Sequence, residues 1–146
     1  MVFCLSLISE DVVRVAFVAG LYGKSNLDGL MIDQVVDLKE DLLQEEAKTM
    51  FGTDESKAEA AKKLPESIYP RIFKILTHCL KQNGAGYLVG NELSLGDLAI
   101  YEATQMCFQN NPKFLDDYKD LLTIRSKVES HPGLKEYLQK RKVTPI

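Results

Sequence analysis

The segment 93–98 constrains the fold most strongly, because Ser94 and Asp97 stand at the two positions of a helix capping box. In such a box the serine hydroxyl accepts a hydrogen bond from the amide three residues later, and the acidic side chain accepts one from the serine amide. Leu93 can also pack against Leu98 as a hydrophobic staple. A helix is therefore predicted to begin at this point.

The helix that follows is apolar on nearly all sides up to residue 108, apart from Glu102, Thr104 and Gln105. A helix with this pattern belongs in the middle of a bundle. The residues 110–112, Asn-Asn-Pro, are predicted to end it.

The rest of the chain also shows helical rather than alternating periodicity, so the predicted fold class is all-α. The further predicted helices cover residues 12–19, 27–51, 54–83 and 114–130, with a last one from Pro132. Within 54–83, Pro65 and Pro70 are expected to break or kink the helix.

An acidic stripe lies on the predicted helix 27–51, where Asp33, Asp37 and Asp41 recur four residues apart and Glu40 flanks them. Like charges at this spacing cost roughly 0.2–0.5 kcal/mol per pair, so the stripe needs an explanation. One explanation is a solvated face relieved by Lys39. The other is a cationic partner: an Arg or Lys across a subunit interface, a ligand ammonium, or a weakly held divalent ion. The apolar positions of this helix are Leu27, Leu30, Met31, Val35, Leu38 and Leu42.

Composition excludes several classes of function. The 146 residues are 45% apolar and 27% charged, which fits one globular domain that needs no tightly bound cofactor to fold. A net charge of −3 argues against nucleic acid as a partner. No apolar run approaches the roughly 20 residues that a membrane-spanning helix needs. Cys4, Cys79 and Cys107 form no metal-binding or disulfide pattern, which indicates a reduced, cytoplasmic protein.

No catalytic motif is visible. His78 and Cys79 are adjacent in a predicted helix, so their side chains diverge and cannot form a nucleophile–base pair. The Gly-Ala-Gly at 84–86 lacks the Lys-Ser/Thr of a phosphate-binding loop and is interpreted as a turn.

A family resemblance enters with the segment 86–102, GYLVGNELSLGDLAIYE. It resembles the C-terminal helical domain of cytosolic glutathione S-transferases, and segments 35–41 and 131–146 resemble the sigma-type branch, particularly its nematode members. The resemblance implies a glutathione S-transferase C-terminal-like helical bundle over 24–146. Residues 1–23 would then be a remnant of the preceding domain with its linker helix.

The resemblance also implies function: conjugation of glutathione, as co-substrate, to small hydrophobic electrophiles, in glutathione metabolism and detoxification. The implied partner is a second copy in a homodimer, or a related transferase subunit. Asp41 matches an aspartate that reaches across the dimer toward glutathione. Asp37, Glu40 and Asp41 match a magnesium site between subunits in some prostaglandin D synthases. The resemblance assigns Ser94 and Asp97 the structural role of a helix capping box, as derived above.

An electrophile pocket is implied at positions matching the family's binding wall, although Lys48 stands where some relatives have an aromatic residue. Its residues would be Lys48, Phe51, Ala99, Ala103 and Ile146.

The thioredoxin-like domain that carries the family's catalytic Tyr does not fit into residues 1–11. None of the tyrosines present stands in a comparable strand–turn context, so no catalytic residue is assigned and the chain is expected to be catalytically incomplete alone. Two alternatives stay open: a non-catalytic helical interaction module or crystallin-like structural protein, and a short splice form or incomplete gene model.

Overall fold

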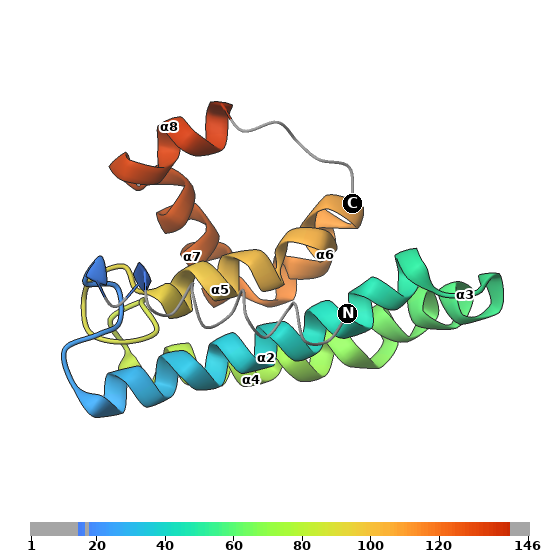
Figure 1. Ribbon diagram of the computed structural model, residues 1–146, viewed down its shortest axis with the longest axis horizontal. Coiled ribbons are helices and arrows are strands. Elements are labelled where there is room, and N and C mark those ends of the chain that lie inside the picture. Colours follow the sequence, from blue (N-terminus) through green and yellow to red (C-terminus); the bar gives the residue numbers. More distant parts are fainter. Residues whose placement is uncertain (1–14, 17, 141–146) are drawn as a thin grey trace.

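The computed structural model describes residues 15–16 and 18–140, and every element with regular structure among them is helical (Figure 1). The all-α prediction is confirmed. The elements are α2 (Asn26–Phe51), α3 (Asp54–Lys63), a π-helical turn η1 (Leu64–Ile68), α4 (Tyr69–Asn83), α5 (Leu95–Ala103), α6 (Gln105–Asn110), a 3₁₀-helix η2 (Pro112–Asp117), α7 (Lys119–Ser130) and α8 (Pro132–Lys140).

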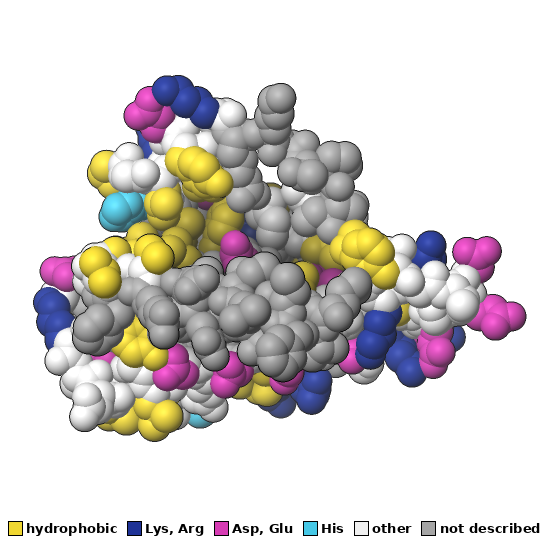
Figure 2. All heavy atoms as spheres, in the orientation of Figure 1, with side chains coloured by type: hydrophobic (Ala, Val, Ile, Leu, Met, Phe, Trp, Pro, Cys, Tyr) yellow, Lys and Arg dark blue, Asp and Glu magenta, His cyan; other side chains and the backbone are white. Residues whose placement is uncertain are grey.

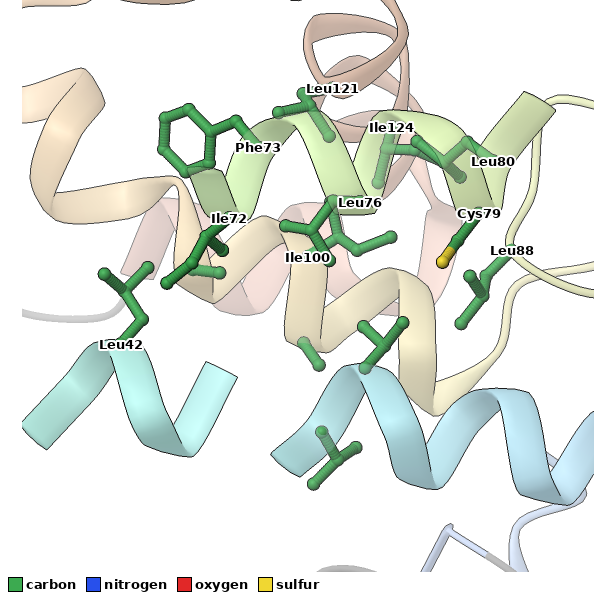
Figure 3. Close-up of a cluster of buried hydrophobic side chains, with 14 of the residues drawn as sticks. Leu42, Ile72, Phe73, Leu76, Cys79, Leu80, Leu88, Ile100, Leu121 and Ile124 are labelled. Atoms are coloured by element: carbon green, nitrogen blue, oxygen red, sulfur yellow. The ribbon is translucent and has the colours of Figure 1, made fainter. Parts of the chain in front are cut away.

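The bundle is built around α5. α2 packs along one side of α5 and α7 along another, while α4 contacts both α2 and α7 (Figure 1). The facing side chains interlock in a single core, to which α2 contributes Leu42, α4 Phe73, α5 Ile100 and α7 Leu121 (Figure 3). These four side chains are fully buried. None of the described helices is long and apolar enough to cross a membrane.

The helix predicted over 12–19 falls partly outside the described residues. Val15, Ala16 and Val18 are helical, and the chain turns at Gly20, whose φ is +74°. A positive φ is the conformation that glycine adopts readily at a helix end.

α2 begins at a second capping box, formed by Ser25 and Asp28, and ends at Gly52 as predicted. Its buried face differs in part from the predicted apolar stripe, since Leu27 and Leu30 are 67% and 64% exposed. Ile32 is fully buried instead. Residues two positions apart on a helix are rotated by roughly 200°, so Leu30 and Ile32 project to nearly opposite sides of α2. Because Ile32 faces the core, Leu30 faces outward.

The two prolines interrupt the stretch 54–83, as predicted. Pro65 lies in η1 and Pro70 in the first turn of α4, so each missing amide falls where the hydrogen-bond ladder is irregular or just beginning. The result is a π-helical turn between two α-helices rather than a sharp kink.

The predicted capping box at the start of α5 is present and buried. Asp97 accepts hydrogen bonds from the amide of Ser94 at 2.9 Å, from the Ser94 hydroxyl at 2.7 Å and from the amide of Leu88 at 2.8 Å. Burial raises the pKa of Asp97, although these bonds act in the opposite direction. Asp97 therefore ties the loop before α5 to the helix itself.

Gly96 allows this loop to approach α5. A Cβ at this position would lie 2.0 Å from the Cδ2 of Leu88, which is only 1% exposed. The close approach thus depends on the absence of a side chain at residue 96.

The single core helix predicted from 95 to 108 is wrong in one respect, because it is interrupted at Thr104. The Thr104 hydroxyl donates to the carbonyls of Ile100 at 3.0 Å and Tyr101 at 2.9 Å. Arg125 of α7 in turn donates to the Thr104 hydroxyl at 2.9 Å and to the Tyr101 carbonyl at 3.2 Å. A buried guanidinium thus binds one backbone carbonyl and the threonine hydroxyl at this interruption.

Candidate functional site

The acidic face of α2, which we define as Asp33, Asp37, Glu40 and Asp41, lies away from the core. Asp37 and Asp41 are exposed, and Figure 2 shows acidic side chains at intervals over α2. Asp33 is half-buried and accepts a hydrogen bond from the Tyr22 hydroxyl. Burial, the bond to Asp33 and the charges of Asp33 and Asp37 together raise the pKa of Tyr22 to about 12.

One of these acidic side chains is paired within the chain. The Lys39 ammonium lies 2.8 Å from a Glu40 carboxylate oxygen and 3.4 Å from one of Glu102 on α5. Burial alone would lower the pKa of Lys39, but the two carboxylates outweigh it and hold the pKa above its usual value. Lys39 therefore relieves Glu40, as the solvated-face interpretation predicted. Among the described residues, neither Asp37 nor Asp41 forms an ion pair.

The predicted magnesium ligands do not form a complete site in one copy of the chain. Within the described ranges, no group of three or more Asp, Glu, His or Cys side chains comes close enough to hold a metal ion. An ion bound between two copies by Asp37, Glu40 and Asp41 stays a prediction.

The residues of the expected electrophile pocket lie in two different environments. Lys48 and Phe51 are exposed in the last turns of α2, where Lys48 pairs with Glu45 and Phe51 is 72% exposed. Ala99 and Ala103 lie one turn apart on α5 and are buried. Ile146 is outside the described residues.

Sequence reasoning missed a buried carboxyl group on the inner side of α2. Glu46 is 7% exposed and accepts a hydrogen bond from the Tyr69 hydroxyl at 3.0 Å. Burial raises the pKa of Glu46 to about 7, although the Tyr69 hydrogen bond and the charge of Lys39 act in the opposite direction. Burial and then the Glu46 charge also raise the pKa of Tyr69.

Cys107 on α6 belongs to the same cluster. It is 3% exposed, and burial together with the charge of Glu46 raises the pKa of its thiol to about 11, while Arg125 acts more weakly in the opposite direction. A raised pKa favours the protonated, weakly nucleophilic form of the thiol, so Cys107 serves as a small buried side chain.

The spacing of Glu46 from the apolar residues of α2 indicates that it is buried. It follows Leu42 by four residues and Val35 by eleven, so it shares their side of the helix. Leu42 and Val35 are both buried.

Comparison with known proteins places these features in a family. A model of the family described as "Glutathione S-transferase, C-terminal domain" matches residues 40–141. Among curated proteins, the chain is 30% identical to mouse glutathione S-transferase A4 over 82% of its own length and 54% of that protein. It is 28% identical to S-crystallin SL11 of Nototodarus sloanii, over 86% of this chain and 62% of that protein. The chain thus spans less than two thirds of these relatives.

Among solved structures, the chain is similar to prostaglandin synthase D of Nilaparvata lugens. The two superpose with a TM-score of 0.78 and 26% sequence identity, over 90% of this chain and 66% of that one.

Proposed function

Because this chain belongs to the glutathione S-transferase family through its C-terminal domain, we propose that it is the helical part of a transferase subunit that works in a pair. Glutathione is the proposed co-substrate and a small hydrophobic electrophile the second substrate. The observation that carries the proposal is the exposed pair Asp37 and Asp41 on α2, which has no ion-pair partner among the described residues.

Apolar exposure on the same helix supports the pairing. Leu27 and Leu30 are largely exposed, and Leu30, Asp33, Asp37 and Asp41 follow one another at spacings of three and four residues. They therefore form one continuous face of α2. Exposed apolar side chains beside unpaired charges are typical of a surface that another protein covers.

Within the pair, we assign Asp41 to the glutathione bound by the neighbouring subunit, by way of the glutathione amino group. Asp37 and Glu40 would join Asp41 around a divalent ion between subunits. The similarity to a protein named prostaglandin synthase D supports this assignment.

The electrophile would bind at the end of α2. Phe51 is exposed and offers an apolar ring there, and Lys48 offers a positive charge. Ala99, Ala103 and Ile146 complete the proposed pocket.

We do not assign activation of the glutathione thiol to Tyr22 or Tyr69. A glutathione thiolate needs a positioned donor, but the hydroxyls of Tyr22 and Tyr69 already donate to carboxylates. We therefore propose that the donor lies outside the described residues. We also place the protein in the cytosol, because Cys79 and Cys107 are free buried thiols.

The pairing predicts a charge-reversal effect. Asp37→Lys together with Asp41→Lys should weaken self-association of the chain by at least about tenfold, because two charges that face a cation become like charges. Sedimentation velocity measures the monomer–dimer equilibrium directly.

The matched control is Asp116→Lys with Asp117→Lys, which makes the same change of charge at exposed positions of η2. It should leave self-association unchanged. A native chain that stays monomeric, or equal association of both double variants, would contradict the proposed surface.

A further inference from the structure

A cavity of about 310 Å³ is lined by residues of α3 and α6, among others. These two helices lie toward the same end of the bundle (Figure 1). The cavity volume is at the lower end of the range of small-molecule pockets, roughly 300–1,000 Å³. It includes none of the residues assigned above to glutathione or the electrophile. Nothing in the proposed transferase function uses it.

The cavity has a buried inner surface and an open rim. Leu64, Tyr69 and Cys107 line it and are themselves buried. Ala61 and Asn110 line it and are exposed, so the cavity can be reached from solvent on their side.

The walls suit an aromatic ring. Met106 and Phe114 line the cavity, and the Phe114 ring meets the Tyr69 ring edge to face at 5.9 Å between centroids. A ligand ring can extend this cluster, because aromatic rings favour edge contacts and thioethers favour contact with ring edges.

The charge behind the inner surface is negative. Tyr69 lines the cavity, and its hydroxyl donates a hydrogen bond to the Glu46 carboxylate. The hydroxyl oxygen is left as an acceptor, which the carboxylate strengthens. At the Cys107 thiol, also in the wall, the charge of Glu46 outweighs that of Arg125.

The two cations whose charges act on Glu46 and Cys107 also have partners of their own. Lys39 is paired with Glu40 and Glu102, and Arg125 donates to Thr104, Gln105 and Glu129. A buried carboxylate behind an apolar cavity favours a positively charged ligand over a neutral or anionic one of the same shape.

We propose that this cavity binds small aromatic amines, with the ring between Met106 and Phe114 and the ammonium directed to the Tyr69 hydroxyl in front of Glu46. A single ring with a short aminoalkyl chain fits the volume. The site selects by charge, whereas the electrophile pocket at the end of α2 is defined by Phe51 and Lys48.

The binding should depend on pH. Glu46 is the group that changes charge between pH 6 and 8, where its pKa of about 7 falls. The groups that interact with Glu46 keep their states: Lys39 of α2 stays charged, and Tyr69 of α4 and Cys107 of α6 stay protonated. Arg125 of α7, which interacts with Cys107, stays charged as well. Amine affinity should therefore rise as the pH rises through 7.

The test is calorimetric titration of the full chain with benzylamine and with its neutral counterpart, benzyl alcohol. At pH 8 benzylamine should bind about tenfold more tightly, and Glu46→Gln should remove this advantage while leaving benzyl alcohol binding unchanged. Equal affinities for the two compounds, or an advantage that survives Glu46→Gln, would overturn the proposal.

Two further variants locate the binding. Ala61→Phe fills the exposed rim and should abolish binding of both compounds, whereas Ala85→Phe places the same side chain at an exposed position outside the cavity and should preserve it. Loss of binding in neither variant, or in both, would show that the compounds bind elsewhere. These results are independent of Asp37 and Asp41, so they do not depend on subunit pairing.

Discussion

Asp97→Ala should lower the free energy of unfolding by about 3–5 kcal/mol, the largest effect of any single change considered. Asp97 is 0% exposed and accepts hydrogen bonds from Ser94 and from the amide of Leu88. Alanine leaves two buried amides without their partner, at roughly 1–3 kcal/mol each, and removes the cap of the central helix.

The control is Asp28→Ala, which removes the same residue type from the capping box of α2. That box is exposed, so water replaces the lost bonds and the cost should be only about 1 kcal/mol. Urea denaturation followed by circular dichroism compares the two variants. Equal losses would mean that the buried connection to Leu88 contributes nothing.

Glu46→Gln should stabilise the protein above neutral pH, by up to about 3.5 kcal/mol. The pKa of Glu46 is about 7 in the folded chain against an ordinary value of 4.5, and each pH unit between them is worth about 1.4 kcal/mol. A carboxyl with a raised pKa holds its proton more tightly when folded. The stabilisation that the protonated Glu46 carboxyl gives to the folded chain is therefore complete below about pH 4.5. It is lost progressively as the pH rises and is fully lost above about pH 7.

The measurement is the difference in unfolding free energy between variant and native chain at pH 5 and pH 8. The difference should grow in favour of glutamine as the pH rises. Glu92→Gln, at an exposed side chain, should stay within about 0.5 kcal/mol at both values. A constant difference for Glu46→Gln would show that the carboxyl does not titrate in this range.

Local signals predicted the helices and their ends well. Ser94 and Asp97 are three residues apart, so the hydrogen bond between the Ser94 amide and the Asp97 carboxylate could be predicted from the sequence alone. The stops at Gly52 and Gly84 and the interruption near Pro65 are local in the same way. All follow from backbone chemistry within one turn of helix.

Features set by distant residues could not be predicted. The interruption at Thr104 depends on Arg125, which is 21 residues away, and Glu46 meets a tyrosine 23 residues away. Periodicity indicated an amphipathic α2 but not that Leu27 and Leu30 face outward, because the packing against α5 selects the buried side.

The acidic face illustrates a different limit. The sequence identified Asp37 and Asp41 as charges in need of a partner, and of the acidic face only Glu40 has a cation among the described residues. The proposal is that a second subunit or a ligand faces the other two.

Glutathione conjugation by the purified 146-residue chain tests the central proposal most directly, namely that its described helices are the helical part of a transferase and that none of their tyrosines activates the thiol. With glutathione and an aryl halide, the rate should not exceed the spontaneous rate and should not saturate. Saturable turnover would contradict the claim, above all if Tyr22→Phe or Tyr69→Phe abolished it, because a described tyrosine would then be the donor.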